Sequence, residues 1–361
     1  MPAAHSGSIR DLRAQAIGRS LFAPCELRTA LERLEFVQAD PIRAPARAQD
    51  LILRHRVTDY RAGDLERCYP SLDLEEDYLY AYGFLPRRVR QLLHPRRRSK
   101  LSRRDAQVLA AVAAAGTVHP RDLHVPFGRA RVVNAWGGYS QATKAALERL
   151  HHRGLTRVAR REAGIRIYEA CPPQVATLSR AERLRELIVV VARVLEPVPQ
   201  RTLGAIAAHL RRSLQTEHRA ALHGLLQAGR LERRTVDGIS YLSTARIQES
   251  EEPPRSVRFL APFDPVVWDR LRFEHLWGWA YRFEAYTPPA KRVRGYYALP
   301  LLWADAVIGW ANVGRNGGAL QIELGFVEQR PKSAAFRREL DAEIARLEVF
   351  LSEKPAHPSI G

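Results

Sequence analysis

The chain has 361 residues, a formal net charge of +18 and 46% hydrophobic residues, which is enough material for two or three packed domains. Of its 57 Lys and Arg residues, five are Lys and 52 are Arg. Arg binds phosphates and base edges bidentately and stays charged, so this composition favours a polyanionic partner such as nucleic acid. A solvated basic surface without such a partner has the same composition, and charge alone leaves both interpretations open.

The cysteines and the apolar runs indicate in which cellular compartment the protein is found. The three Cys residues stand singly, without CxxC spacing, which fits a reducing compartment and argues against a disulfide framework or a zinc site. No apolar core of signal-peptide length opens the chain, and the strongest apolar run, Leu187–Leu195, is too short to cross a bilayer. We expect a cytoplasmic protein without a membrane span. We also expect no metal site, because His151 and His152 lack the spacing of metal ligands.

Three helix starts share a capping-box pattern, in which a Ser is followed three residues later by an acidic residue. The boxes begin at Ser8, Ser102 and Ser179, and each opens a helix with apolar periodicity. We expect the second helix to end near Gly116 and the third before Pro197, because Gly and Pro both stop helices.

Two stretches repeat one layout, a helix, a Gly, a strand, a turn and a second strand. They are Ala145–Ala170 and Ala220–Thr244, and the pairs Ala163-Gly164 and Asp237-Gly238 close their predicted hairpins. A helix, a short connection, a second helix and a hairpin form a winged-helix unit. Winged helices often bind DNA, whereas others bind proteins, and the layout leaves both functions open.

We therefore predict an α+β fold with three tandem winged-helix units, the first more diverged, over residues 1–98, 99–176 and 177–250. After a polar linker, Gln248–Ser256, aromatic and polar residues alternate between Pro and Gly turns, as they do in short strands. This pattern predicts a small β-barrel or sheet domain over 255–330. Apolar residues at helical spacing predict a last helix, Ser333–Leu351, within 331–353.

Two charged stretches allow more than one interpretation. Within the β region, Ala285–Leu299 predicts a hairpin whose basic tip carries Lys291, Arg292 and Arg294. Such a hairpin can lie in a DNA groove, although an ordinary solvated turn has the same composition. The acidic run Asp73–Tyr78 suits a helix start better than a pair of catalytic carboxylates, because acids favour helix N-termini.

The stretch FVQADPIRAPAR places Gln38 and Asp40 between an amphipathic helix and Pro41. Pro41 pushes Asp40 into the extended region, where alternate side chains point the same way and Ala39 points the other. This geometry suits a water held between a base, Asp40, and a hydrogen-bonding positioner, Gln38. On spacing alone, an Asp-Pro turn with a solvated Gln is the more common outcome.

Three stretches carry a resemblance to a known family. Gln38–Tyr60, the tract ending at Gly83–Pro86 and the block Ala261–Leu302 occur in order over nearly the whole chain. With them the chain resembles the crosslink-repair DNA glycosylase YcaQ family, bacterial winged-helix relatives of the azinomycin-resistance glycosylase. The resemblance implies tandem winged helices with a C-terminal β-domain. It also implies hydrolysis of the N-glycosidic bond of N7-alkylated guanine, including bases tied in interstrand crosslinks.

The family carries its chemistry in a Gln–aliphatic–Asp or Gln–aliphatic–Gln triplet, which Gln38-Ala39-Asp40 matches. The resemblance implies Asp40 as general base and electrostatic stabiliser and Gln38 as the residue that positions water. An N7-alkylguanine is positively charged and leaves with little acid assistance, so one carboxylate can stabilise the oxocarbenium-like sugar and activate water. We expect a monofunctional glycosylase that needs no nucleophilic Lys and no cofactor.

Several residues are candidates for DNA contacts. Four Arg after the triplet are expected to grip phosphates beside the lesion, and they are Arg43, Arg47, Arg54 and Arg56. The family pattern also has Arg at positions 47 and 56, and a surface salt bridge is the alternative for each. The basic tip aligns with the family's β-domain hairpin, which is implied to track DNA. Tyr80 departs from the family, which has a His there; a Tyr can still hydrogen-bond to a base or stack on it.

The expected partner is double-stranded DNA that contains alkylated or crosslinked purines, bound by a monomer associated with the nucleoid. The alternative is a non-catalytic winged-helix regulator, which should bind one DNA sequence tightly and usually as a dimer. A protein-interaction scaffold is disfavoured by the +18 charge.

Overall fold

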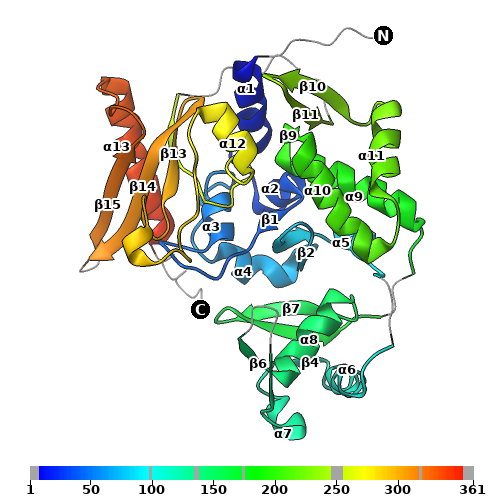
Figure 1. Cartoon of the computed structure of the whole chain (residues 1–361). Coiled ribbons are helices and arrows are strands. Elements are labelled where there is room, and N and C mark those ends of the chain that lie inside the picture. Colours follow the sequence, from blue (N-terminus) through cyan, green and yellow to red (C-terminus); the bar gives the residue numbers. More distant parts are fainter. Residues whose placement is uncertain are drawn as a thin grey trace. The chain divides into compact units, whose positions relative to one another are not determined.

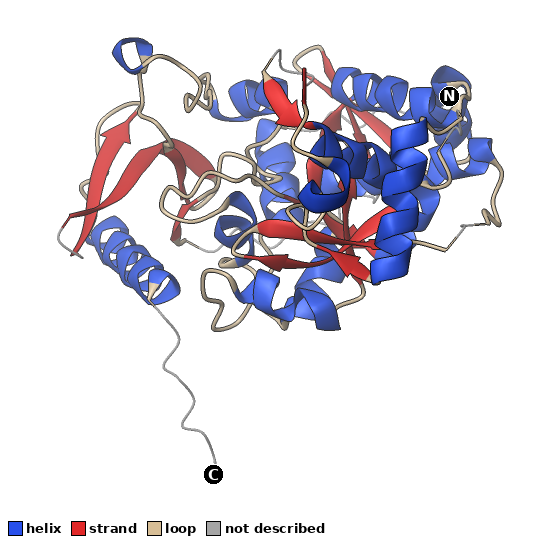
Figure 2. Ribbon diagram, turned by 90° about the horizontal axis from the view of Figure 1, so that it is seen from below, coloured by secondary structure: helices blue, strands red, loops and turns tan. Residues whose placement is uncertain are grey.

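The computed structural model describes residues 8–96, 100–133, 138–172, 175–244, 255–316 and 319–352, which combine helices with antiparallel sheets (Figures 1 and 2). The predicted mixture of helices and sheets is confirmed. Two compact units interleave along the chain. The first unit comprises the described residues within Met1–Leu65, Val189–Ala205 and His223–Gly361, and the second those within Glu66–Ile188 and Ile206–Leu222.

The borders of the three predicted winged-helix units stay a prediction, and Gln248–Pro254 of the predicted linker lies outside the described residues. No helix within the described ranges has both the length and the apolar character needed to cross a membrane.

The first unit begins with α1 (Ile9–Ser20) and α2 (Leu27–Leu34), followed by the short strand β1 (Val37–Gln38) and α3 (Ala48–Leu53). The predicted capping box at the start of α1 is confirmed, because the Ser8 hydroxyl accepts from the Asp11 N–H and the Asp11 carboxylate accepts from the Ser8 N–H. Apolar residues of α1, among them Leu12, pack in one core with residues of the C-terminal part of the chain. The segment between β1 and α3 has no regular secondary structure, and it carries Asp40.

A four-stranded antiparallel sheet forms the C-terminal part of the first unit, as predicted. Its order is β12 (Val257–Phe259), β13 (Leu299–Trp303), β14 (Ala306–Asn316) and β15 (Ala319–Phe326). The helix α12 (Arg270–Trp277) precedes β13, and α13 (Ala334–Leu351) lies against the sheet (Figure 2). The Phe336 ring at the start of α13 packs edge-on against the rings of Trp303 and Phe326.

The predicted basic hairpin is wrong. Between α12 and β13 the chain forms a loop with one 3-10 turn, η2 (Pro289–Lys291). Proline has no N–H for a strand ladder, and two prolines stand at the start of this turn. The Glu284 carboxylate then accepts the N–H groups of three consecutive residues, Val293, Arg294 and Gly295, at 3.0, 2.8 and 3.3 Å. These N–H groups are therefore bound to a side chain rather than to a strand.

The second unit contains helices and three antiparallel pairs of consecutive strands, β2–β3, β5–β6 and β7–β8. Its elements are α4 (Asp64–Cys68), which begins in the first unit, η1 (Tyr69–Ser71), β2 (Leu74–Tyr78), β3 (Tyr82–Pro86), α5 (Arg87–Leu93), α6 (Arg103–Ala115), β4 (Thr117–Val118), α7 (His124–Phe127), β5 (Arg131–Val133), β6 (Tyr139–Gln141), α8 (Ala142–His152), β7 (Thr156–Glu162) and β8 (Ile165–Ala170).

Three further helices contain residues of both units. They are α9 (Arg180–Leu195), α10 (Gln200–Leu214) and α11 (His218–Gln227), and the strands β9 (Val198–Pro199), β10 (Glu232–Val236) and β11 (Ile239–Ser243) of the first unit complete this stretch. The predicted ends of α6 before Gly116 and of α9 before Pro197 are confirmed. Both hairpin turns are confirmed as well, because each places two successive residues at positive φ, as a type I′ turn requires.

Two three-stranded sheets share one strand order. In each, the first strand in sequence pairs with the third, and the third pairs with the second. The sheets are β4-β8-β7 in the second unit and β9-β11-β10 in the first. The repeat seen in the sequence thus reappears as a repeat of topology.

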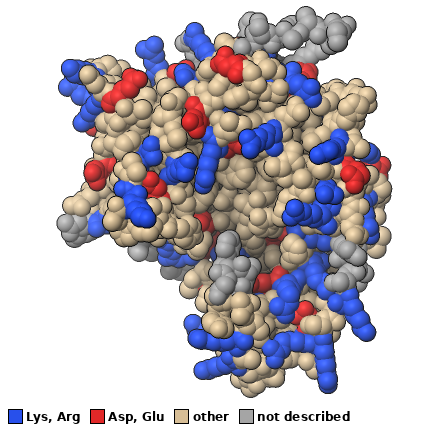
Figure 3. Space-filling view, viewed as in Figure 1, with Lys and Arg blue, Asp and Glu red and all other residues tan. Residues whose placement is uncertain are grey.

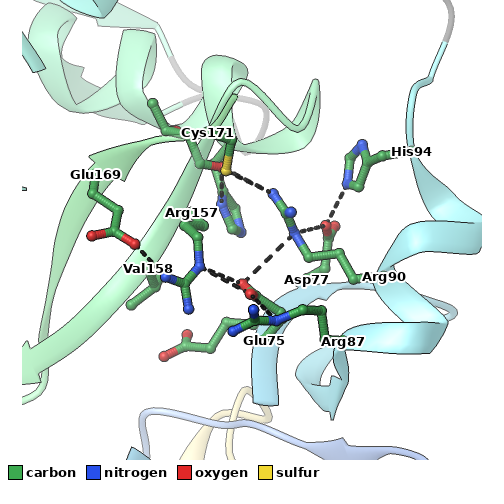
Figure 4. A network of polar contacts seen from close by, with 12 residues as sticks. Glu75, Asp77, Arg87, Arg90, His94, Arg157, Val158, Glu169 and Cys171 are labelled. Carbon is green, nitrogen blue, oxygen red and sulfur yellow. Dashed lines mark hydrogen bonds and ion pairs between the residues drawn. The ribbon is translucent and has the colours of Figure 1, made fainter. Parts of the chain in front are cut away.

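The acidic run Asp73–Tyr78 forms the strand β2 from Leu74 onward rather than the predicted helix start, and its buried carboxylates have Arg and His partners. On β2, Glu75 accepts from the Arg157 Nε at 2.9 Å, and Asp77 accepts from the His94 Nε2 at 2.6 Å (Figure 4). Burial opposes ionisation of Asp77, but the His94 hydrogen bond and nearby positive charges outweigh it and hold the pKa of Asp77 well below its usual range. Ion pairs between β2 and β7 therefore stabilise the second unit internally.

Candidate active site

Gln38 ends β1 with its side-chain amide held in one orientation. The indole Nε1 of Trp268 donates to the Gln38 Oε1 at 2.9 Å. Because an indole N–H can only donate, the atom facing it must be the amide oxygen. The NH₂ group of Gln38 consequently has no partner among the residues that the structure describes, and it is available as a donor.

Asp40 is held by two backbone contacts. Its Oδ1 accepts from the Ile42 N–H at 2.9 Å, and its own N–H donates to the Gln49 Oε1 at 3.4 Å. Gln49 is buried on α3, and the next residue of that helix, Asp50, accepts from the Tyr60 hydroxyl at 2.7 Å. The Asp-Pro turn considered from the sequence is thus present, and it fixes the carboxylate while Oδ2 accepts no bond within the described part of the chain.

The half-buried position of Asp40 changes its acidity. Burial raises the pKa of Asp40 above its usual value, and the Ile42 N–H offsets part of that effect. A carboxylate with a raised pKa takes up a proton more readily, which is what a general base near neutral pH needs. Spacing alone favoured an Asp-Pro turn with a solvated Gln. The Gln38 amide is not simply solvated, because Trp268 binds its oxygen.

A cavity of about 710 Å³ lies beside this loop in the first unit. Its lining combines a residue just after the triplet with aromatic and polar side chains of the C-terminal part, and it includes Ala44, Tyr296, Tyr297, Asn312, Gln321 and Glu323. Burial raises the pKa of Tyr297 strongly, and the negative charge of Asp40 adds to the effect. These tyrosines and Trp268 are not predicted as site residues from the sequence, although all lie in the block Ala261–Leu302 that carries the resemblance.

Two of the four Arg expected to grip phosphates are structural instead. Arg56 is fully buried, and its Nη1 and Nη2 donate to the two oxygens of Asp264 at 2.8 and 2.9 Å. Arg54 has 3% of its side chain exposed and pairs with Glu343 of α13. Neither guanidinium can reach a DNA phosphate without breaking a buried ion pair, so the prediction for these two residues is wrong.

The other predicted contacts remain compatible with DNA but stay predictions. Arg43 is exposed, and Arg47 is half-buried as the residue that precedes α3. Tyr80 is half-buried between β2 and β3 of the second unit.

The three basic residues of the loop between α12 and β13 have different surroundings. Lys291 is exposed. Arg292 donates to the Thr287 carbonyl at 2.8 Å and lies over the Tyr296 ring at 5.0 Å. Arg294 lies over the rings of two Trp residues at 5.0 and 5.5 Å, and they are Trp279 and Trp310.

Comparison with known proteins agrees with the resemblance. A family model described as DNA glycosylase AlkZ-like matches residues 31–350. The solved structure of Streptomyces sahachiroi DNA glycosylase AlkZ is similar over 97% of this chain and 99% of that chain, with a TM-score of 0.63 and 14% identity. At that identity the structural likeness shows a shared fold. Because the family model spans most of the sequence, the chain belongs to the AlkZ-like DNA glycosylase family and is a hydrolase of N-glycosyl bonds.

Proposed function

We propose that this protein is a monofunctional glycosylase that removes N7-alkylated guanine from double-stranded DNA and unhooks guanines tied in interstrand crosslinks. Asp40 is the general base and electrostatic stabiliser, and Gln38 positions the water. The observation that carries the proposal is the complementary fixing of these two side chains. Trp268 leaves the amide of Gln38 as a donor, and Ile42 leaves Oδ2 of Asp40 as an acceptor.

One water fits the hydrogen-bonding capacity of this pair. It accepts from the Gln38 NH₂ with one lone pair, donates a proton to Oδ2 of Asp40, and keeps its second lone pair for the anomeric carbon. The N-glycosidic bond breaks with its electron pair going to the base, which neutralises the positive charge of the alkylated ring. The Asp40 carboxylate stabilises the oxocarbenium-like sugar during this step.

The rest of the molecule supports a DNA substrate. The repeated strand order supports the predicted tandem winged helices. In Figure 3, Lys and Arg side chains gather over the part of the second unit that carries α6, α7 and β6. The exposed basic residues of that stretch include Lys100, Arg103, Arg104, Arg121, Arg129 and Arg131. We propose a monomer that acts in the cytoplasm at the nucleoid and grips phosphates with such residues and with Arg43, Arg47, Lys291 and Arg292.

The test is base release from a duplex that carries N7-methylguanine, read with and without alkali to separate an abasic site from a nicked strand. Asp40→Asn should abolish release while DNA binding is kept, and the exposed Asp59 of the same unit provides a matched control, Asp59→Asn, that should keep full activity. Release by the wild type that survives in Asp40→Asn would remove Asp40 as the base. Tight binding without release by the wild type, on this duplex or on a crosslinked one, would overturn the proposed substrate.

A further inference from the structure

Tyr286 is a large aromatic residue left on the surface of the loop between α12 and β13, which lines the cavity of the candidate site. Its side chain is 80% exposed, whereas the neighbouring aromatic residue of the same loop, Tyr297, is buried. Burial raises the pKa of Tyr286, and the negative charge of Asp40 adds to the effect. Ring contacts connect Tyr286 to the candidate site, because Phe283 touches both Tyr286 and Tyr297, and Tyr297 lines the same cavity as Ala44.

Contacts within the loop hold the Tyr286 ring in place. The ring of Phe283 contacts that of Tyr286 edge-on, with centroids 6.0 Å apart, and packs against Tyr297 at 5.2 Å. Between them, the Glu284 carboxylate is bound by three backbone N–H groups of the same loop. An exposed aromatic ring on such a support loses little conformational entropy when it stacks on a ligand.

Three other electron-rich rings in or near this loop already carry a cation. Arg292 covers Tyr296, and Arg294 lies over Trp279 and Trp310. Within the described residues, no cation lies over Tyr286. An uncovered tyrosine ring attracts a flat cation by its quadrupole, and the negative charge of Asp40 acts in the same direction.

We propose that Tyr286 is a specificity residue of the site, whose ring stacks on a positively charged N-alkylpurine and selects it over neutral bases. This inference rests on the proposed function and names the feature of the substrate that the site reads, its charge. An unmodified purine gains only the stacking contact, whereas an N-alkylated one adds the cation–π attraction. The charge disappears when the glycosidic bond breaks, so the added attraction acts on the substrate and not on the released base.

This timing predicts a particular kinetic signature. An interaction that is stronger with the substrate than with the transition state affects binding and does not accelerate the chemical step. Removing the ring should therefore weaken binding of the lesion while kcat at saturating substrate stays the same or rises slightly.

The experiment measures Kd for a duplex with 2′-fluoro-7-methyl-2′-deoxyguanosine, which keeps the cationic base but resists its loss, against the same duplex with guanine. Tyr286→Leu keeps an apolar side chain without the ring, and Tyr286→Phe keeps the ring without the hydroxyl. The lesion preference should fall about 2- to 30-fold in the Leu variant and persist in the Phe variant. Tyr78→Leu is the matched control and should keep the preference, because this exposed tyrosine lies on β2 of the second unit and does not line the cavity.

Each contrary result overturns the inference. A Leu variant that keeps the preference removes the ring from lesion recognition, and a Phe variant that loses it assigns the effect to the hydroxyl. A wild type without any preference for the cationic base also refutes it. Failure of the proposed function is separate, because it shows as absence of base release from the cleavable N7-methylguanine duplex.

Discussion

In the proposed mechanism Asp40 acts as a base only while it is ionised, and its raised pKa brings the pH at which it titrates into a measurable range. Lowering the pH should reduce kcat/KM, with the acid limb centred above about 4, where an unperturbed Asp titrates. A raised pKa also means that the ionised form is disfavoured in the folded state, so Asp40→Asn should keep or raise the melting temperature. An acid limb at or below pH 4 in the pH–rate profile would contradict this assignment.

Arg56 has a buried, ion-paired guanidinium and Arg43 an exposed one, so their substitutions should affect stability differently. Arg56→Ala strands the buried Asp264 carboxylate, which should lower the free energy of unfolding by about 3–5 kcal/mol. Arg43→Ala removes an exposed side chain and should change that free energy by less than about 0.5 kcal/mol. Urea denaturation measures both, and an Arg56→Ala protein as stable as the wild type would show that the ion pair is dispensable.

Tyr297 and Tyr281 are buried tyrosines of one loop that differ in their hydroxyls. The Tyr297 oxygen has less than 1 Å² exposed and no partner within the described structure, whereas the Tyr281 hydroxyl donates to the Ala298 carbonyl at 2.7 Å. Tyr297→Phe should therefore leave stability unchanged or raise it, and Tyr281→Phe should lower it by about 1 kcal/mol. Thermal unfolding of the two variants compares them, and equal losses would refute the distinction.

At the scale of elements, the buried His151 of α8 makes the packing of α8 against the β7–β8 hairpin depend on pH. Burial is the main cause that lowers the pKa of His151 to about 4, whereas an unfolded His titrates near 6.5. Between these values the unfolded state binds the extra proton, so stability falls as the pH drops from about 6.5 to 4, by on the order of 3 kcal/mol. Amide exchange of β7 and β8 at pH 7 and pH 5 should show this loss, and His151→Gln should reduce it. Equal pH sensitivity in the variant would exclude His151 as its source.

At the scale of the whole molecule, the +18 charge implies a steep salt dependence of DNA binding. Each Arg or Lys that contacts a phosphate contributes about 0.9 to the slope of log K against log salt. Arg43→Ala and Lys291→Ala should each flatten the slope by about that amount. The matched control is Arg315→Ala, since this exposed Arg donates to the Leu351 carbonyl and should leave the slope unchanged. A flat salt response of the wild type would contradict the DNA-binding proposal.

How much of this molecule the sequence could predict depends on the distance between partners. The hairpin turns and the capping boxes at Ser8 and Ser179 were predicted correctly, because their partners lie within a few residues and their chemistry is local. The box at Ser102 is only half formed, because the Asp105 carboxylate binds Arg149 instead. The structural roles of Arg54 and Arg56 were not predicted, because their carboxylate partners are 289 and 208 residues away in the sequence. Phosphate contacts were the simpler interpretation, because both Arg residues follow Asp40 closely. The basic hairpin failed because one buried Glu284 replaces the strand ladder.

The candidate site divides in the same way. Spacing alone favoured a solvated turn for Gln38 and Asp40, and the family resemblance raised them to catalytic candidates. The turn is present, yet the contact that orients the amide comes from Trp268, 230 residues later. No periodicity in the sequence links an indole to an amide over that distance, so only the fold brings this contact to light.

The bond between Trp268 and Gln38 also sets when the site can exist during synthesis. The ribosome makes Gln38 and Asp40 early, but residue 268 of 361 emerges late. Until then the Gln38 amide has no indole to orient it, and Arg56 has no Asp264 beside it. A nascent or truncated chain that ends before Trp268 should therefore carry the triplet without an ordered amide. The candidate pair Gln38 and Asp40 is completed only when the C-terminal part of the chain folds onto residues made much earlier.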